Sequence, residues 1–192
     1  MAESRPSQDT VNEFVIACHG DLAKARTMVE QRPELFQTSA SWDETPMGAA
    51  AHTGNQEIVR FLLSQGVPLD IIAASVLGLT DEVAGFLAAD PALIDARGAH
   101  GIPLLFHAAA AGQQAVCALL VDRGADVNTG RNGNTALHAA ALFGHTDLAG
   151  WLLAHGADAN ARDYEGKTPL ERAQQAGHAS VADLLRRHAG GA

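Results

Sequence analysis

Residues 133–160 read GNTALHAAALFGHTDLAGWLLAHGADAN, and residues 166–188 read GKTPLERAQQAGHASVADLLRRH. The two stretches match at an offset of 33 residues, from Gly133 to Gly166. Each contains a first apolar helical segment that ends in Gly, a short turn, and a second apolar helical segment. Gly tolerates the left-handed conformation that ends a helix. The pattern predicts a helix-turn-helix unit that is repeated in register.

The same pattern of helix-ending residues continues toward the N-terminus. A glycine that ends the first helix of a unit recurs at spacings of 34, 24, 34, 32 and 33 residues, at Gly20, Gly54, Gly78, Gly112, Gly144 and Gly177. The expected end of the second helix falls twelve residues after each of these glycines, at Arg32, Gly66, Asp90, Gly124, Gly156 and Ala189. One pair of helices cannot bury its own apolar face, so the units are expected to stack into a solenoid.

Several strings resemble a known repeat family. TALHAAALFGH, TPLERAQQAGH, TPMGAAAHTGN, GADVN and GADAN are similar to the motifs of ankyrin-repeat proteins, and the overall arrangement is similar to small stand-alone bacterial members. The resemblance implies an all-α ankyrin-repeat solenoid of about six stacked helix-turn-helix repeats with short β-hairpin fingers. We expect a disordered N-terminal tail at residues 1–10 and a single domain at 11–189, with repeats at about 11–39, 40–69, 70–96, 97–128, 129–161 and 162–189.

Two repeats depart from this pattern. Only seven residues separate Asp70 from Gly78, so repeat three has no room for a finger, and the row of fingers is expected to have a gap there. In repeat four, Pro103 precedes the helix where other repeats have a Thr that can cap it through its hydroxyl group. The start of that helix is therefore expected to lack a side-chain cap.

Composition excludes several classes of protein. The 192 residues are 47% hydrophobic and 18% charged, which excludes a disordered chain, and the net charge of −9 would repel nucleic acid. Cys18 and Cys117 are far apart and form no CxxC, so a disulfide framework or a cysteine zinc site is not expected. The first ten residues carry no signal-peptide core, and no run is apolar enough to span a membrane. We predict a cytoplasmic protein without membrane or nucleic-acid partners.

The sequence contains no recognisable catalytic or cofactor motif. Most of its nine histidines fall at positions that the repeat explains, and none has HExxH spacing. Gly166, Lys167 and Thr168 resemble the end of a phosphate-binding loop, but Asp163 and Glu165 would repel phosphate. We therefore predict a protein that is not an enzyme and has no catalytic residues, metal or cofactor.

An alternative remains open at this stage. His52, His100 and His107 are not determined by the repeat pattern. If the fold brought them together, the chain would be a metal- or cofactor-handling protein or an enzyme that uses these imidazoles.

The family resemblance also implies where a partner would bind. Ankyrin proteins make contacts through finger tips and the exposed side of the first helix, and large aromatic side chains in such positions favour binding. Counting from the capping position gives the predicted partner-binding residues Trp42, Glu44, His52, His100, Arg131, Asn132, Leu142, Phe143, Tyr164 and Glu165. Packing between inner helices is an equal alternative for Phe143. We predict a monomeric interaction module or scaffold that holds an unidentified partner protein against its concave face.

Overall fold

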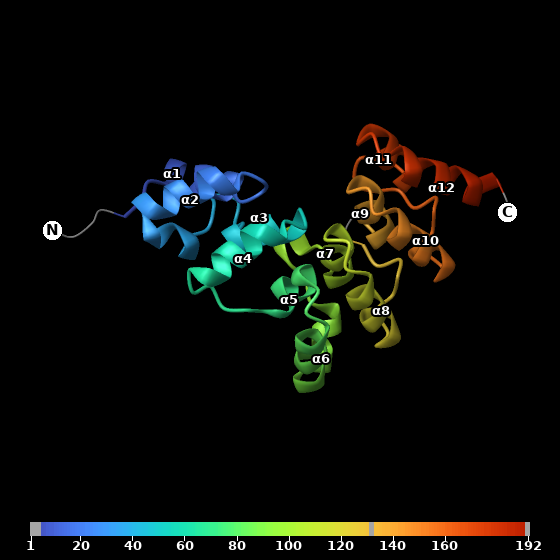
Figure 1. Cartoon of the computed structure of the whole chain (residues 1–192), viewed down its shortest axis with the longest axis horizontal. Helices are drawn as coiled ribbons and strands as arrows, with labels where there is room; N and C mark the ends of the chain where they lie inside the picture. The colour runs from blue at the N-terminus through green and yellow to red at the C-terminus, as the bar shows by residue number, and fades with distance from the viewer. Residues whose placement is uncertain (1–4, 131–132, 191–192) are drawn as a thin grey trace.

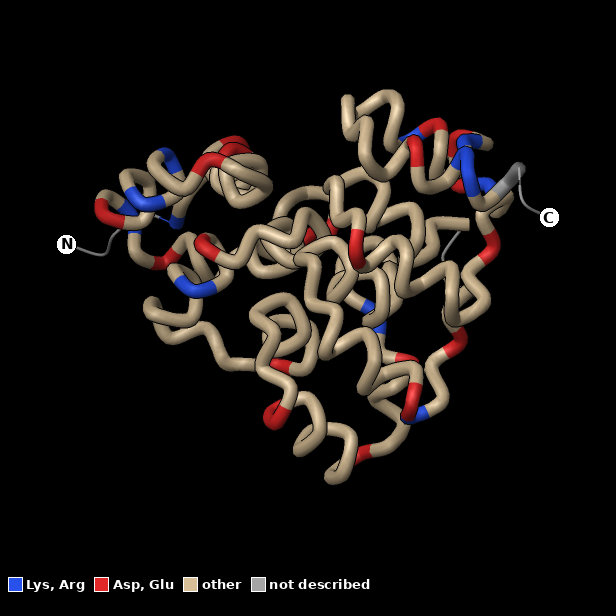
Figure 2. Tube along the Cα trace, turned by 45° about the vertical axis from the view of Figure 1, so that its right-hand side comes forward, with Lys and Arg blue, Asp and Glu red and all other residues tan. Residues whose placement is uncertain are grey.

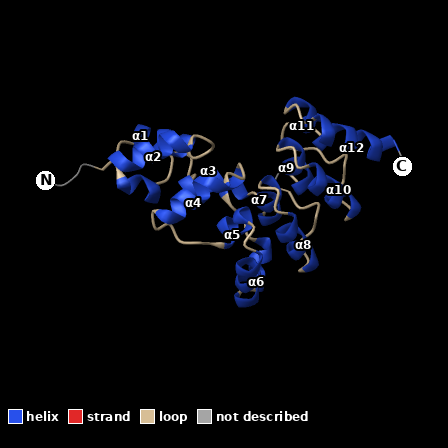
Figure 3. Cartoon of the chain, in the orientation of Figure 1, coloured by secondary structure: helices blue, strands red, loops and turns tan. Residues whose placement is uncertain are grey.

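The computed structural model describes residues 5–130 and 133–190. In these residues it shows helices joined by turns and loops, with no strand (Figure 3). The helices pair as α1 (Gln8–Ala17) with α2 (Leu22–Gln31), α3 (Pro46–His52) with α4 (Gln56–Ser64), α5 (Ile71–Leu77) with α6 (Thr80–Ala89), α7 (Leu104–Ala110) with α8 (Gln114–Asp122), α9 (Ala136–Leu142) with α10 (Thr146–Ala154), and α11 (Pro169–Gln175) with α12 (Ala179–Gly190). Short 3-10 helices occupy Pro33–Gln37 (η1), Pro91–Asp95 (η2) and Ala99–Gly101 (η3).

The six helix pairs follow one another in an arc, with the two termini at opposite ends (Figure 1). The odd-numbered helices form the inner row, in which α7 contacts α9 and α9 contacts α11. Alanines at 49–51, 108–110 and 139–141 are buried on these helices. Because Ala has a small side chain and a high helix propensity, the backbones of neighbouring repeats can approach closely. The predicted solenoid is confirmed.

A recurring hydrogen bond sets the register between neighbouring repeats. The residue after the glycine that ends an inner helix reaches back to a carbonyl of the preceding inner helix. The bonds run from Gln113 Nε2 to Val76 O (3.0 Å), from His145 Nε2 to Ala110 O (2.9 Å) and from His178 Nε2 to Leu142 O (3.0 Å). A carbonyl can only accept, so each imidazole carries its proton on Nε2. These contacts account for His145 and His178 without a chemical role.

The inner helices begin as the motif predicts. The hydroxyl of Thr45 accepts a bond from the amide of Gly48, and Thr168 forms a reciprocal capping box with Glu171. Helix α7 starts after Pro103 without a side-chain cap, as expected from the missing Thr. The sequence departure in repeat four is therefore a real difference in how that helix starts.

The fingers are tight turns and not β-hairpins. We use finger for residues 40–44 in repeat two, 98–102 in repeat four and 163–167 in repeat six. Each is closed by a bond from its first amide to its last carbonyl, at 2.8, 2.9 and 3.0 Å respectively. An isolated bridge joins Arg97 and Pro103 on either side of the repeat-four finger. The predicted β-hairpins are wrong because each arm is too short to form a ladder.

The first helix starts earlier than the sequence suggested. Helix α1 begins at Gln8, where the Ser7 hydroxyl accepts a bond from the amide of Thr10 at 3.2 Å. Val11 and Phe14 then anchor the helix in the core. The described part of the segment at 1–10 is therefore not a disordered tail throughout, since its last three residues belong to α1.

The missing finger of repeat three changes the packing around it. The chain runs from α4 into α5 without a finger, and η3, in the finger of repeat four, contacts α3 in repeat two. A Cβ atom added to Gly48 would lie 2.9 Å from Ala99 Cβ, and Gln56 Nε2 bonds Ala111 O at 3.4 Å. The expected gap in the row of fingers is therefore closed, because repeats two and four meet across repeat three.

This contact predicts an unusual cost for substitution of Gly54. Gly54 has φ +68°, and an added Cβ would lie 2.7 Å from the backbone nitrogen of Ala111 in repeat four. Gly177 has the equivalent position in repeat six, with φ +79° and no atom within 4 Å. Gly177→Ala should lower the free energy of unfolding by about 1–2 kcal/mol through backbone strain alone. Gly54→Ala should lower it by about 1–3 kcal/mol more. Urea unfolding of both variants measures the difference, and equal losses would contradict contact between repeats two and four.

Candidate functional site

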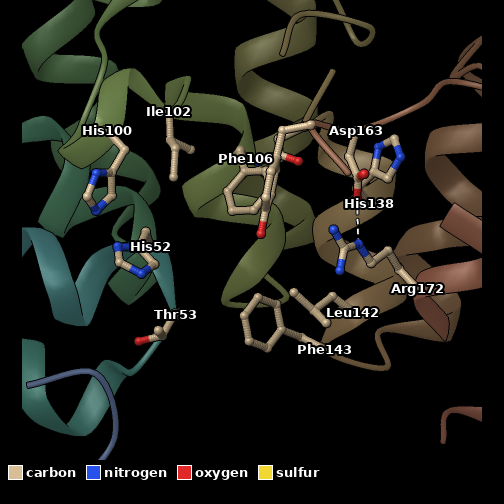
Figure 4. Close-up of a pocket in the computed structure, with 12 residues that line it drawn as sticks. His52, Thr53, His100, Ile102, Phe106, His138, Leu142, Phe143, Asp163 and Arg172 are labelled. Atoms are coloured by element: carbon tan, nitrogen blue, oxygen red, sulfur yellow. Dashed lines mark hydrogen bonds and ion pairs between the residues drawn. The ribbon is translucent and has the colours of Figure 1, made fainter. Parts of the chain in front are cut away.

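A pocket of about 580 Å³ opens on the side of the inner helices. It is lined by residues of repeats two, four, five and six: His52, Thr53, His100, Ile102, Phe106, Asn134, His138, Leu142, Phe143, Asp163, Tyr164 and Arg172. Repeat three contributes none of them, which follows from the loss of its finger. Figure 4 shows His52 and His100 on one side, Phe106 between, and Leu142 and Phe143 near Arg172 on the other.

The wall formed by repeats five and six is apolar and partly open to solvent. Leu142 is 37% exposed and Tyr164 is 64% exposed. Phe143 is half-buried and packs against the main hydrophobic core, so packing accounts for part of its surface. The guanidinium carbon of Arg172 lies 5.5 Å from the centroid of the Tyr164 ring, a cation–π contact. Leu142, Phe143 and Tyr164 therefore offer a large contact surface, and Arg172 packs against the Tyr164 ring.

Arg172 also holds the finger of repeat six in place. Its Nε donates to Asp163, and its Nη2 lies 3.2 Å from Glu165 Oε1. Asp163 further accepts the amides of Glu165 and Lys167 at 2.9 and 3.0 Å. Burial by itself would raise the pKa of Asp163, but the bonds from Arg172 and the two amides hold that pKa below its usual value. Tyr164 therefore extends from a turn that is tied to helix α11.

His138 is a structural histidine at the back of the pocket. Its Nδ1 accepts from the Thr135 amide at 3.3 Å, and its Nε2 lies 3.1 Å from the carbonyl oxygen of Lys167. The ring thus caps α9 and joins it to the finger of repeat six. Burial lowers its pKa, although the Lys167 carbonyl opposes this shift.

The opposite wall contains a buried carboxylate surrounded by imidazoles. Glu44 is only 2% exposed, and we call His19, Glu44, His52 and His100 the Glu44 cluster. Glu44 Oε1 lies 3.0 Å from His52 Nδ1 and 3.1 Å from His100 Nε2, while Glu44 Oε2 lies 3.5 Å from His19 Nε2. Trp42 Nε1 donates to Oε2 at 2.8 Å. The expectation that Glu44 faces a partner is wrong, because the repeat-four finger brings His100 against it.

Two unusual backbone conformations flank this cluster. Asp43 has φ +63° and His100 has φ +57°, and they are the only residues other than glycine with positive φ in the described chain. Asp43 takes the position at which the fingers of repeats four and six have Gly101 and Gly166. A left-handed conformation costs a residue with a Cβ roughly 1–2 kcal/mol. The surrounding contacts therefore hold the two fingers in conformations that direct Glu44 and His100 toward each other.

Burial is the largest cause of the pKa shifts of His52 and of Cys18. Burial lowers the pKa of His52, with the Glu44 carboxylate opposing the shift and His19 and His100 adding to it. Burial and the Glu44 charge together raise the pKa of Cys18 to about 12. Cys18 is therefore a protonated, unreactive thiol.

The structure leaves His107 outside the Glu44 cluster that contains the other two histidines of the alternative hypothesis. His107 is fully buried on α7, and its ring lies edge-on to Phe106. The backbone groups of Ala51 and Ile102 are its nearest polar neighbours, but neither ring nitrogen makes a well-formed hydrogen bond. Burial lowers its pKa to about 4. The trio of His52, His100 and His107 is therefore wrong; His19 and Glu44 lie beside the first two instead.

The remaining predicted residues fall at different distances from the pocket. Trp42 is exposed on the finger of repeat two, but it does not line the pocket with Phe143 and Tyr164. Glu165 lies beside the pocket, paired with Arg172 and Lys167. Arg131 and Asn132 lie outside the described residues. The repeat pattern leaves His19 undetermined as well, and its place beside Glu44 and His52 follows from packing between segments that are distant in sequence.

Comparison with known proteins agrees with this architecture. The family model for ankyrin repeats in three copies matches residues 13–129, 71–163 and 105–192. The chain belongs to the ankyrin-repeat family, whose members generally act as protein–protein interaction modules.

Curated relatives share this repeat region as part of longer proteins. The chain is 33% identical over 151 residues to Ankyrin repeat and SOCS box protein 11 of Danio rerio, which covers 74% of this chain and 43% of that protein. It is 30% identical over 173 residues to the Nuclear factor NF-kappa-B p105 subunit of Gallus gallus, covering 83% of this chain and 17% of that protein. It is 42% identical over 89 residues to the E3 ubiquitin-protein ligase Ufd4 of Drosophila melanogaster, covering 45% and 3%. The chain thus spans less than half the length of each of these relatives. No described helix combines the length and apolar character required to cross a membrane.

The burial of His107 predicts a specific dependence of stability on pH. Its pKa of about 4 lies below the ordinary 6.5, so the unfolded chain binds a proton between these values and the folded chain does not. Stability from this group is present above pH 6.5 and is lost as the pH falls toward 4. His107→Leu removes the titration and two poorly paired nitrogens. The unfolding free energy of the variant minus that of wild type should therefore rise by up to about 3 kcal/mol as the pH falls from 7 to 4.

Urea unfolding at several pH values tests this expectation. Most other histidines are present in both proteins and so cancel in the difference, and repeating the comparison in a His52→Gln background removes the interaction between His52 and His107. His188→Leu is the control, because that side chain is exposed. A constant difference between wild type and His107→Leu across this pH range would contradict a buried neutral His107.

Proposed function

We propose that this chain is a non-catalytic interaction module, or part of a scaffold, that binds a segment of a partner protein in the pocket on its concave face. The observation that supports this most directly is that Leu142 and Tyr164 remain exposed together at a pocket whose other wall carries His52 and His100. Large, partly exposed side chains beside a pocket are typical of the residues that contribute most of the binding energy. The general role of the family supports the same conclusion.

The chemistry of the walls defines the partner segment. Phe106, Leu142 and Phe143 favour a large apolar side chain that enters the pocket. Asn134 and Tyr164 supply polar groups that can bond the backbone of that segment. We therefore propose an extended or loop segment with one apolar anchor as the bound element.

Charge adds a second requirement. Residues 61–161 contain three of the 13 basic side chains and nine acidic ones, and Figure 2 shows the blue positions mainly toward the two ends of the solenoid. Acidic surfaces accelerate association with basic partners and slow it with acidic ones. We propose a partner with basic residues near its apolar anchor, with affinity that falls as salt increases.

The polar residues of the pocket support a binding role over a catalytic one. Arg172 and Asp163 hold the finger of repeat six, and His138 caps α9. These groups are committed to structural contacts within the chain. Trp42 and Glu165 are proposed as outer contacts around the pocket, and Arg131 and Asn132 are proposed as further partner contacts by their place in the repeat. We further propose a monomer that works in the cytoplasm, consistent with two thiols in buried, unpaired form.

A peptide selection tests the proposed surface. Random peptides displayed on phage would be selected on the immobilised full chain, and the dissociation constants of recovered peptides measured by fluorescence anisotropy. We expect peptides with an apolar anchor and flanking basic residues. The double variant Leu142→Ala, Tyr164→Ala should weaken their binding at least about tenfold, or 1.4 kcal/mol.

A matched control uses exposed apolar residues far from the pocket. Ile16 and Leu69 are 58% and 36% exposed, similar to Tyr164 and Leu142, and neither lines the pocket. The double variant Ile16→Ala, Leu69→Ala should bind the same peptides as wild type does. Equal weakening by both double variants, or unchanged binding by the pocket variant, would count against the proposed site.

A further inference from the structure

We propose that His19, Glu44, His52 and His100 form a binding site for one divalent transition-metal ion, with Zn²⁺ as the ion that best fits the donor set. The site lies between the fingers of repeats two and four, at the edge of the concave pocket. Its support is independent of whether the pocket binds a partner protein.

The spacing of the donor atoms fits a single ion. The ligand atoms of His19, Glu44 and His52 all lie within 4.8 Å of one another. The three distances from the carboxylate oxygens to imidazole nitrogens are 3.0, 3.1 and 3.5 Å. Zinc bonds of about 2.0–2.1 Å in a tetrahedron place neighbouring ligand atoms about 3.3 Å apart. For His52 and His19 the distances of 3.0 and 3.5 Å to the carboxylate bracket this value. His100 lies outside this closely spaced group of three but is 3.1 Å from the same carboxylate, and a movement of its half-exposed side chain would complete the coordination.

The tautomer of His19 leaves its second nitrogen available. His19 Nδ1 lies 3.0 Å from the carbonyl oxygen of Val15, which can only accept, so Nδ1 carries the proton. Nε2 faces Glu44 Oε2 at 3.5 Å, so this nitrogen can coordinate an ion that lies between the two atoms. A metal-binding histidine is commonly oriented by such a backbone bond on its other nitrogen.

His52 and Trp42 add to the same arrangement. His52 Nδ1 is buried 3.0 Å from Glu44 Oε1, but its geometry does not make a hydrogen bond. Trp42 Nε1 donates to Glu44 Oε2, an outer contact that orients the carboxylate as supporting residues do around metal ligands. Three imidazoles with one carboxylate are a donor set that suits zinc and related ions, whereas Mg²⁺ prefers oxygen ligands.

The site also has a path for an ion to enter. The side chain of His100 is 49% exposed and that of His52 is 19% exposed, and both line the pocket. His19, on the far side, is held at the end of helix α1 by its bond to Val15. An ion can therefore reach the cluster from the concave face without unfolding the repeats.

Zinc binding to the untagged full chain tests the proposal. After treatment with a chelator and dialysis, the protein is titrated with Zn²⁺ by calorimetry, and bound metal is counted by mass spectrometry. We expect one equivalent of Zn²⁺, no comparable binding of Mg²⁺, and a higher melting temperature with Zn²⁺ present. Co²⁺ in place of Zn²⁺ should give the visible absorption of a four-coordinate site.

Variants assign the binding to the cluster. Glu44→Gln, His52→Gln and His100→Asn should each weaken Zn²⁺ binding at least about tenfold, and Trp42→Phe should weaken it about tenfold through the carboxylate. The control double variant His155→Gln, His188→Asn removes two histidines outside the cluster and should bind as wild type does. Because His100 is half-exposed on a finger, His100→Asn keeps the proposal testable if a buried variant fails to fold. Substoichiometric Zn²⁺ binding, or equal affinity in His100→Asn and the control, would overturn the proposal.

Discussion

The contact between the repeat-four finger and the inner helix of repeat two organises the concave face. Repeat three is about ten residues shorter than its neighbours, with a spacing of 24 instead of 34, and the missing segment is the one that would otherwise form its finger. Without that segment, Ala99 approaches Gly48 and His100 reaches Glu44. Had repeat three kept a finger of normal length, it would stand between these residues. One deletion thus creates both the Glu44 cluster and the outline of the pocket.

The two walls of the pocket are stabilised in different ways. Around repeat six, Arg172 ties the finger to its helix through Asp163 and supports the Tyr164 ring. Around repeat two, the buried Glu44 carboxylate accepts from Trp42 and His100, while the contact with His52 Nδ1 does not have hydrogen-bond geometry. A buried charge requires compensation, and satisfied networks are rigid whereas incompletely satisfied ones respond to a ligand. The first wall is therefore suited to presenting a fixed surface, and the second to taking up a cation.

These properties connect the two proposals without making either depend on the other. His52 and His100 belong both to the cluster and to the pocket lining. An ion bound between the fingers would fix His100, which adopts a left-handed conformation. A more rigid finger loses less conformational entropy when a partner segment binds beside it. Metal binding and partner binding would then favour each other through a shared side chain.

The sequence by itself determined the repeat architecture, because the period of the glycines and the Thr caps at Thr45 and Thr168 are local signals. The same local logic explained His138, His145 and His178 and identified the missing finger of repeat three. It also placed Leu142, Phe143 and Tyr164 on one face, since residues at equivalent repeat positions share an orientation. The expected β-hairpins failed because finger length, and not motif identity, decides whether a ladder forms.

Only the tertiary structure decided what fills the space of the missing finger. The cluster joins residues 19, 44, 52 and 100, whose separations follow no metal-ligand motif. Glu44 counted as an exposed finger residue by position, yet the neighbouring finger buries it, because packing between non-adjacent repeats is not encoded in any one repeat. His107 is the opposite case. The sequence made it a candidate ligand, but its position on α7 places its side chain in the hydrophobic core. The period of a solenoid predicts which way a side chain faces within its own repeat, whereas chemistry between repeats depends on which repeats touch.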